Sequence, residues 1–521
     1  DQVESDRCGV GQERERENGG GHTGPWGETM KRGKVDRMGM RNQVGVMAGL
    51  VVLLLASGSV SYSADLDLEV GDPRTMTFEP VEFSPPEPER VVLDNGLVVY
   101  LLEDHELPLV TITATMRTGG WLDPAEKVGL AAMTGAVMRT GGGGGLSSEQ
   151  VDAELEQFAG DIHIGIGRQS GSASLDVLSK DLNRGLEIFA GLIRSPAFES
   201  ARLELAKLQA IEGIRRRQDS PGSIVSREFG KALYGADHPT ARESSVDSIK
   251  RLTRQDLIAF HRNTIHPNGM LLGVTGDFAK DDMLASIRKM FGDWQKGTVP
   301  ELKIPDVSEA DMSQSVVRFI NKDTSQTHLR VGHLSIKESD PDYVALAIAN
   351  DILGGSSFRS RLFNDVRTKR GLAYSVGSRL YTGMHDQGVW MMKAETKLTS
   401  TQEVIERFVA NMDRMREEPV TDAELAEAKE AYVNSFVFSF ASSSSIVSRL
   451  IELEYDGLPK DFLQQLRAQV VQLTRDDVQA AAKKHLHPDR LKIIAVGSGD
   501  ALVKALSTFG EVKEIKLTPE G

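Results

Sequence analysis

Apolar and polar residues alternate in several short segments of the chain, and apolar residues recur at helical spacing between these segments. Residues 91–102 read VVLDNGLVVYLL, where Asn-Gly separates two apolar runs and predicts a β-hairpin. The same reasoning predicts strands at 110–116, 162–166 and 270–275, and helices at 129–140, 182–194, 199–217 and 254–264. Strands joined by hairpins and followed by runs of helices predict an α+β fold with a mainly antiparallel sheet packed with helices.

The pattern occurs twice. Residues 252–276 (LTRQDLIAFHRNTIHPNGMLLGVTG) and 473–497 (LTRDDVQAAAKKHLHPDRLKIIAVG) are identical at 8 of 25 positions without a gap. The pentapeptide SIVSR also recurs, at 223–227 and 445–449. We therefore predict two tandem homologous units of similar length, at 65–300 and 301–521, joined near a polar stretch with two prolines at 296–312.

The beginning of the chain has the composition of a targeting segment. Residues 1–39 are mostly polar, and we leave this leader out of the fold. Arg41 precedes the apolar run Val44–Ala56, which has the length of a signal-peptide core and is short for a membrane span. We expect a signal peptide at 40–64 and an exported, periplasmic chain with no membrane span after cleavage; the alternative is an uncleaved N-terminal anchor.

Composition narrows the classes of function. The 521 residues include 61 Lys and Arg against 75 Asp and Glu, so the net charge is −14. An acidic chain is a poor general binder of nucleic acid, which requires a basic surface. Cys8 is the only cysteine, which excludes an internal disulfide framework and a cysteine-based zinc site.

Several segments resemble one enzyme family. They are the helix that begins GLAAMTGA at Gly129, ALYGADHP at 232–239, the His-Pro-plus-strand segment at 266–277, and ILGGSSFRSRLFNDVRTKRGLAYSV at 352–376. Together they are similar to the pitrilysin/insulinase-type zinc metallopeptidases, the inverted zincins, over roughly residues 85–500. The resemblance implies two tandem peptidase-like units, with a zinc helix of the form G-L-A-H-x-x-E-H in the first.

The zinc positions of that family are replaced in this chain. The resemblance places the two histidines at Ala132 and Ala136, the glutamate between them at Gly135, and the third ligand, a glutamate, at Gly213. None of these four side chains offers an electron pair, and a catalytic zinc requires three protein ligands. We therefore predict that this chain binds no metal and that its N-terminal unit has a degenerate zinc site.

A second family feature is retained. Arg367 and Tyr374 are seven residues apart, as are the Arg and Tyr of the family's second unit, which the resemblance implies reach toward a zinc site. A tyrosine hydroxyl can donate to a carbonyl oxygen that becomes an oxyanion. The alternative is an ordinary surface arginine and a tyrosine at the edge of the core.

The resemblance also implies a peptide-binding strand at 161–167 (DIHIGIG), with Ile162, His163, Ile164 and Gly165 beside an extended substrate. Main-chain hydrogen bonds would give affinity with little demand on substrate sequence. The alternative is an ordinary edge strand that small residues keep soluble.

These observations predict a non-zinc-binding subunit of an exported heterodimeric zinc metallopeptidase. It would lend Arg367 and Tyr374 to a composite site, while zinc would lie in a homologous partner subunit and the substrate would be a peptide or unfolded protein. The alternative is a catalytically silent peptide-binding or scaffold protein of the same fold, without a peptidase partner, for which a homodimer is one assembly. A neighbouring gene for an intact zinc-bearing relative would favour the first prediction.

Overall fold

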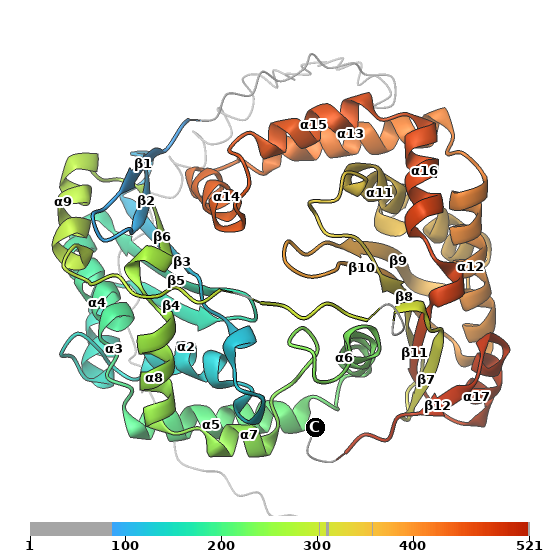
Figure 1. Cartoon of the computed structure of the whole chain (residues 1–521), viewed down its shortest axis with the longest axis horizontal. Coiled ribbons are helices and arrows are strands. Elements are labelled where there is room, and N and C mark those ends of the chain that lie inside the picture. Colours follow the sequence, from blue (N-terminus) through green and yellow to red (C-terminus); the bar gives the residue numbers. More distant parts are fainter. Residues whose placement is uncertain (1–85, 302, 309–311, 357, 519–521) are drawn as a thin grey trace, which may run out of the picture. The chain divides into compact units, whose positions relative to one another are not determined.

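Two six-stranded sheets dominate the computed structural model, which describes residues 86–518 except 302, 309–311 and 357 (Figure 1). The predicted leader at 1–39 and signal peptide at 40–64 lie outside the described residues. Each strand and helix predicted from the periodicity is present, with bounds that differ by at most two residues. The described residues belong to a single compact unit.

The first sheet has the strand order β1-β2-β6-β3-β5-β4, in which β2 and β6 are parallel and all other neighbours are antiparallel. Its strands are β1 (Glu89–Val92), β2 (Val98–Glu103), β3 (Leu109–Met116), β4 (Asp161–Ile166), β5 (Gly171–Leu178) and β6 (Met270–Gly276). The helices of this half are α2 (Leu130–Thr140), α3 (Ser148–Gln157), α4 (Leu182–Arg194), α5 (Ser200–Arg216), α6 (Pro221–Tyr234), α7 (Val246–Arg251), α8 (Arg254–Thr264) and α9 (Lys280–Phe291).

The second sheet has the order β12-β7-β11-β8-β10-β9, in which β7 is parallel to both of its neighbours and the other pairs are antiparallel. Its strands are β7 (Val316–Asn321), β8 (Thr327–Leu334), β9 (Ala373–Tyr381), β10 (Val389–Thr396), β11 (Lys492–Gly497) and β12 (Val512–Glu514). The helices of this half are α11 (Tyr343–Asn350), η5 (Asp351–Gly355), η6 (Phe363–Lys369), α12 (Thr401–Glu417), α13 (Asp422–Phe438), α14 (Ser443–Asp456), α15 (Phe462–Gln472), α16 (Arg475–His485) and α17 (Asp500–Leu506).

The two sheets confirm the predicted fold class, α+β with mainly antiparallel pairing.

Short sequence signals determine where individual strands and helices begin and end. Gly96 adopts a φ of +81° in the hairpin between β1 and β2, a conformation that favours glycine. The repeated Leu-Thr-Arg segments begin α8 and α16 with the same capping box, in which Thr253 and Thr474 pair with Asp256 and Asp477.

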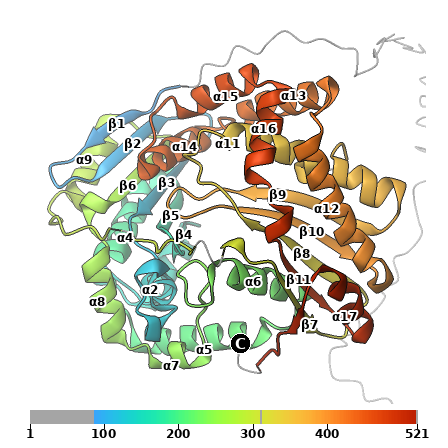
Figure 2. The same ribbon diagram turned by 45° about the vertical axis from the view of Figure 1, so that its right-hand side comes forward.

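Each sheet has one face covered by helices of its own half and the other by a helix of the opposite half. The SIVSR repeat lies in the two exchanged helices. In α6, Ile224 and Val225 pack on the second sheet against Ile494 and Val496. In α14, Ile446, Val447 and Ile451 pack on the first sheet against Tyr100, Leu102 and Leu271. Figures 1 and 2 show α6 beside β11 and α14 beside β6.

A polar network fastens α14 to the first sheet. The carboxylate of Glu454 accepts two hydrogen bonds from the guanidinium of Arg90, at 2.8 and 2.6 Å, and one from the hydroxyl of Tyr100. Arg117 donates to the carbonyl oxygen of Glu454 at 3.3 Å and lies over the ring of Tyr455, 4.7 Å from its centroid. These contacts join elements that are more than 300 residues apart in the sequence.

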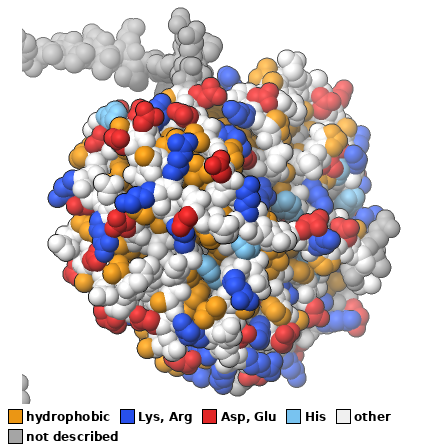
Figure 3. Space-filling model, turned by 60° about the vertical axis from the view of Figure 1, so that its left-hand side comes forward, with side chains coloured by type: hydrophobic (Ala, Val, Ile, Leu, Met, Phe, Trp, Pro, Cys, Tyr) orange, Lys and Arg blue, Asp and Glu red, His pale blue; other side chains and the backbone are white. Residues whose placement is uncertain are grey.

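The surface carries charged side chains of both signs. Among the residues that the structure describes, no helix is both long and apolar enough to cross a membrane. Acidic and basic side chains are interspersed over the described part of the face drawn in Figure 3.

Candidate functional site

Helix α2 carries three of the four positions that correspond to the family's zinc motif. The helix begins after Gly129, whose φ is +105°, and the buried carboxylate of Asp123 caps it. That carboxylate accepts hydrogen bonds from the backbone N–H groups of Gly129 and Ala131, at 2.7 and 2.8 Å. Burial raises the pKa of Asp123, against the lowering effect of these hydrogen bonds. The helix is thus held in place without any metal ligand.

Ala132 and Ala136 lie one turn apart on the exposed side of α2, whereas Gly135 is buried against the first sheet. A Cβ atom at Gly135 would lie 2.5 Å from the backbone nitrogen of Ile166 and 2.9 Å from the carbonyl carbon of Gly165. Real Cβ atoms do not approach backbone so closely, so no side chain fits at position 135 unless α2 moves away from β4. At the position that corresponds to the family's catalytic glutamate, the space that a side chain would need is therefore filled by the backbone of β4.

Gly213, the position of the third ligand, is exposed on α5, which packs beside α2. A Cβ atom there would meet nothing within 4 Å. The residues present at these four positions, two alanines and two glycines, do not fit a zinc ion, because none has a donor atom in its side chain.

Within the described parts of the chain, one group of three residues brings potential metal-binding atoms within 4.8 Å of one another: Asp340, Asp342 and His485. It lies in the second half, away from α2. The Nζ of Lys484 donates to Oδ2 of Asp342 at 2.6 Å, and Nε2 of His485 lies 2.7 Å from the same oxygen. This group is therefore a network of ion pairs that already compensates its carboxylate charge.

The predicted peptide-binding residues lie on β4, which is one of the two edge strands of the first sheet. The side chains of Ile162 and Ile164 are 2% and 3% exposed and belong to the core, while His163 is exposed. Gly167 donates to Ser170 at the hairpin end, so by alternation the backbone groups of Ile162, Ile164 and Ile166 point away from β5. Only main-chain groups of Ile162 and Ile164 are thus placed for an incoming peptide.

That outward edge is partly covered by α2. Nε of Arg139 donates to the carbonyl oxygen of Ile162 at 2.6 Å, and the same guanidinium pairs with Asp152 at 3.0 Å. Gly135 lies against the backbone nitrogen of Ile166. The sequence did not reveal this cap, because the reach of an arginine to a strand 23 residues away depends on how the helix crosses the sheet edge.

Arg367 and Tyr374 lie together in the second half, at the start of its edge strand. Arg367 is in the last turn of η6, which Gly371 ends with a φ of +63° and hydrogen bonds from Gly371 and Leu372 back to the carbonyl oxygens of Arg367 and Val366. Tyr374 is the second residue of β9 and is 78% exposed. The guanidinium carbon of Arg367 lies 4.6 Å from the ring centroid of Tyr374 and 4.7 Å from that of Phe363. The arginine therefore contacts two aromatic rings, and periodicity alone did not identify Phe363 as its second partner.

Two ion-pair clusters anchor the segment that carries Arg367. Asp365 accepts hydrogen bonds from Arg407 at 2.7 Å, from Asn411 at 2.8 Å and from Arg370 at 3.0 Å. One helical turn earlier, Arg361 makes two parallel hydrogen bonds to Glu424 of α13, at 2.7 and 2.8 Å. The Arg361 pair lowers the pKa of Glu424 to about 2. Arg367 takes part in none of these ion pairs. They hold the helical segment that carries it.

Tyr374 opens onto a pocket of about 280 Å³. It is lined by Gln326, Arg367, Gly371, Leu372, Ala373, Tyr374, Glu395, Thr396 and Lys397. The arrangement supplies a cation and a phenol hydroxyl on one exposed wall, which are hydrogen-bond donors for a carbonyl or carboxylate oxygen.

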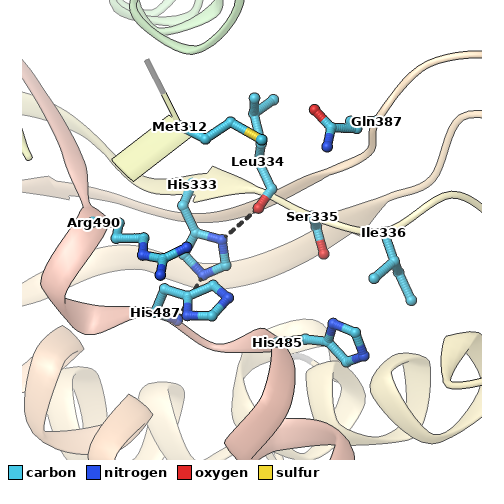
Figure 4. Close-up of a pocket in the computed structure, with 9 residues that line it drawn as sticks. All are labelled: Met312, His333, Leu334, Ser335, Ile336, Gln387, His485, His487 and Arg490. Carbon is cyan, nitrogen blue, oxygen red and sulfur yellow. Dashed lines mark hydrogen bonds between the residues drawn. The ribbon is translucent and has the colours of Figure 1, made fainter. Parts of the chain in front are cut away.

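A smaller pocket, of about 160 Å³, lies at the other end of β8 and contains three histidines (Figure 4). His333 is fully buried, and burial lowers its pKa to about 4. Its Nδ1 lies 2.7 Å from the carbonyl oxygen of Leu334, and its Nε2 accepts from the backbone N–H of His487. His333 is therefore a neutral histidine that joins β8 to the turn at His487, and we assign it a structural role.

The sequence of this chain is similar to a known family model and to several known proteins. A family model described as the peptidase M16 inactive domain matches residues 251–432, which include Arg367 and Tyr374. The uncharacterized zinc protease YmxG of Bacillus subtilis (strain 168) is 24% identical over 364 residues, covering 69% of this chain and 86% of the relative. A non-peptidase homolog, YmxG of Helicobacter pylori, is 24% identical over 403 residues, covering 76% of this chain and 90% of that protein.

A solved structure has the same fold. The crystal structure of a peptidase M16 inactive domain from Pseudomonas fluorescens superposes with a TM-score of 0.71 at 28% identity, covering 79% of this chain and 98% of that one. The matched family model, the similar relatives and the shared fold all indicate one assignment. The chain thus carries a peptidase M16 inactive domain at 251–432 and resembles M16, pitrilysin/insulinase-type, proteins in sequence and fold.

Proposed function

We propose that this protein is the non-zinc subunit of an exported heterodimeric zinc metallopeptidase. In this assignment it binds peptide and lends Arg367 and Tyr374 to a composite site, and a homologous partner subunit holds the zinc. One contrast carries the proposal. The four positions of the zinc motif have no side-chain donor atoms, and one is closed by strand backbone. Arg367 and Tyr374, in contrast, are retained and in contact, and Tyr374 is exposed.

The chemistry of this chain's own residues follows from their types. The hydroxyl of Tyr374 would donate a hydrogen bond to the oxygen of the scissile carbonyl, where negative charge develops. The cation of Arg367, stacked 4.6 Å from the tyrosine ring, would hold that ring in place or bind a neighbouring peptide carbonyl. Loss of one such donor typically costs about 10²–10³ in rate.

The test mixes this chain with a purified homologue that has an intact H-x-x-E-H motif and follows peptide hydrolysis. We expect activity only in the mixture and zinc only in the partner once the subunits are separated. Tyr374→Phe or Arg367→Ala should each lower kcat at least about tenfold, because each removes a donor near the reacting carbonyl. Zinc retained by this chain alone, with hydrolysis by the chain alone, would contradict the proposal.

The chain offers a matched control on the same strand. Arg379 and Tyr381 of β9 form another arginine–tyrosine contact, at 5.6 Å, and Tyr381 is 48% exposed. Arg379→Ala and Tyr381→Phe make the same chemical changes outside the predicted pair, so we expect kcat to stay within about twofold of the unchanged complex. If kcat falls equally for variants of both pairs, the loss is due to a general disturbance of β9 and not to the Arg367–Tyr374 pair.

Export is part of the proposal and rests on the apolar run Val44–Ala56 behind Arg41. Expression of the full chain with cell fractionation, followed by N-terminal sequencing of the mature protein, would test it. We expect a periplasmic protein that begins near Asp65. A full-length protein in the cytoplasmic fraction would contradict this part.

A second candidate is a catalytically silent peptide-binding or scaffold protein without a peptidase partner. The relative from Helicobacter pylori that is described as a non-peptidase homolog favours it. A pull-down of the native protein separates the two functions: recovery of a zinc-bearing homologue supports the heterodimer, and a stable homodimer without that partner supports the scaffold.

A further inference from the structure

The pocket beside Tyr374 has an excess of hydrogen-bond donors that lack partners. Arg367, Lys397, Gln326 and Tyr374 all line it. Lys397 is exposed at the rim, on the turn that follows β10. Among the contacts of the residues that the structure describes, none satisfies the guanidinium of Arg367, the ammonium of Lys397 or the hydroxyl of Tyr374 with an acceptor. Such a wall favours a ligand that brings acceptor oxygens.

Arg367 differs from three nearby arginines, because each of those makes an ion pair and Arg367 makes none with any residue that the structure describes. Arg361 binds Glu424, Arg370 binds Asp365 and Glu403, and Arg407 binds Asp365. Arg367 lies in the same segment and instead contacts the rings of Phe363 and Tyr374. Stacking on aromatic faces fixes the plane of a guanidinium and leaves its N–H edge available for an anion.

The one carboxylate that lines the pocket, that of Glu395, has neighbours on β8. Oε1 of Glu395 lies 3.6 Å from Nδ1 of His328. The half-buried guanidinium of Arg330, on the neighbouring strand β8, also interacts favourably with the charge of Glu395. Glu395 is thus compensated from the β8 side, and Arg367 and Lys397 leave a net positive charge in the pocket.

We propose that this pocket binds a carboxylate of the peptide substrate, through the guanidinium of Arg367 and the ammonium of Lys397. The planar fork of an arginine matches the two oxygens of a carboxylate. The carboxylate is either a free C-terminus or an Asp or Glu side chain, since both present the same group. The inference rests on the proposed function in taking the ligand to be a peptide, and it adds a preference for acidic or C-terminal segments.

The experiment measures binding of fluorescent peptides to the isolated full chain by anisotropy, with no partner present. Four versions of one unstructured peptide are compared: free C-terminus or amide, each with Glu or Gln at an internal position. We expect at least one carboxylate to raise affinity by about tenfold, the usual value of a charge-assisted hydrogen bond. The comparison of the two positions identifies which carboxylate the pocket takes. The preference should shrink as salt rises, because the pocket is open to solvent.

Variants locate the effect in the pocket. Lys397→Gln should reduce the preference for the carboxylate peptide by about threefold or more, because one of its two cations is lost. Lys369→Gln removes the same charge from an exposed position on η6 that does not line the pocket, so it should leave the preference unchanged. Lys397 is not part of the predicted catalytic pair, so this readout is separate from hydrolysis.

The outcomes separate the inference from the proposed function. If acid and amide peptides bind equally, or Lys369→Gln acts as strongly as Lys397→Gln, the carboxylate pocket is wrong while peptide binding stands. If no version of the peptide binds, both the pocket and the peptide-binding function are wrong. A carboxylate preference that Lys397→Gln selectively weakens supports the inference.

Discussion

The edge strands of the two sheets, β4 and β9, are each crossed by a helix that approaches through a glycine. A Cβ at Gly135 would lie 2.5 Å from the backbone nitrogen of Ile166, and one at Gly354 of η5 would lie 2.5 Å from that of Ser378. The surroundings differ. Beside β4 the helix presents two alanines and an arginine that caps the strand, whereas β9 begins at a cluster with an unpaired cation and an exposed tyrosine. The same close contact between a helix and an edge strand thus occurs in both halves, and the predicted Arg367–Tyr374 pair lies only in the second.

The largest effect is expected from adding a side chain where helix and edge strand touch. Gly135→Glu, which restores the family's residue type, should destabilise the protein by about 3 kcal/mol or more, because it forces α2 from β4 and places a charge in the contact. Gly135→Ala and Gly354→Ala should each cost about 1–3 kcal/mol by overpacking. Urea denaturation curves would measure all three.

Gly213→Ala is the matched control for these glycine variants. Gly213 is also within a helix, yet a Cβ there meets nothing within 4 Å. The substitution should therefore stabilise the protein by about 0.5–1 kcal/mol, through the lower entropy cost of alanine in a helix. Loss of stability at Gly213, or none at Gly135 and Gly354, would show that the close approach is not what the two edges share.

A smaller effect is expected from releasing the anchor of η6, which exists only in the second half. Glu424→Gln should cost about 1–3 kcal/mol, because it removes the negative charge and one of the two acceptor oxygens that Arg361 uses, and the side chain of Arg361 is 8% exposed. The measurement is the urea midpoint at pH 7. Arg475→Gln is a control, since its pair with Asp422 is largely exposed and should contribute less than about 1 kcal/mol.

The same anchor predicts a dependence on pH. The hydrogen bonds from Arg361 lower the pKa of Glu424 from 4.5 to about 2 in the folded protein. A depressed pKa means that this contribution to stability is complete above about pH 4.5 and is lost as the pH falls toward 2. Stability of Glu424→Gln should therefore fall less steeply between these values than that of the unchanged protein. Parallel curves would rule out this contribution.

The smallest effect is expected at the cap of β4. Arg139→Ala should cost less than about 1 kcal/mol, since its ion pair with Asp152 is half exposed and the freed carbonyl oxygen of Ile162 can bind water. It should also raise the affinity for an extended peptide by about two- to fivefold if β4 takes one, because a main-chain acceptor is uncovered. Asp152→Asn removes the ion pair and keeps the cap, so it should leave peptide affinity unchanged. An unchanged affinity for Arg139→Ala would argue against β4 as the docking strand.

Much of the fold could be predicted because short-range signals agree with the final packing. Asn-Gly between two apolar runs, the Leu-Thr-Arg capping boxes and the alternating isoleucines of β4 each depend on a few neighbouring residues. The segment of Arg367 and Tyr374 could likewise be placed at a helix end and a strand start, because Gly371 stops the helix. The roles of these two residues, of Ile162 to Gly165 and of the partner's zinc remain predictions.

The remaining features depend on long-range packing. The cap from Arg139 to Ile162, the closure of position 135 by Ile166 and the ring of Phe363 over Arg367 all need the path of a helix across a strand. The exchange of α6 and α14 is a relation between residues far apart in the sequence, such as Ile224 and Ile494 or Ile446 and Leu271. The repeated SIVSR showed that the two helices are equivalent, yet it contained no information on which sheet each one covers.

That exchange makes the duplicated halves depend on each other. Without α14, the apolar side chains of Tyr100, Leu102 and Leu271 would face water, and without α6 the same would happen to Ile494 and Val496. Each half supplies a helix that covers one face of the other half's sheet, so we expect a chain cut between the repeats to be less stable than the whole. The residues at Ala132 and Gly213 change the chemistry of one half, whereas loss of that half would expose an apolar face of the other sheet.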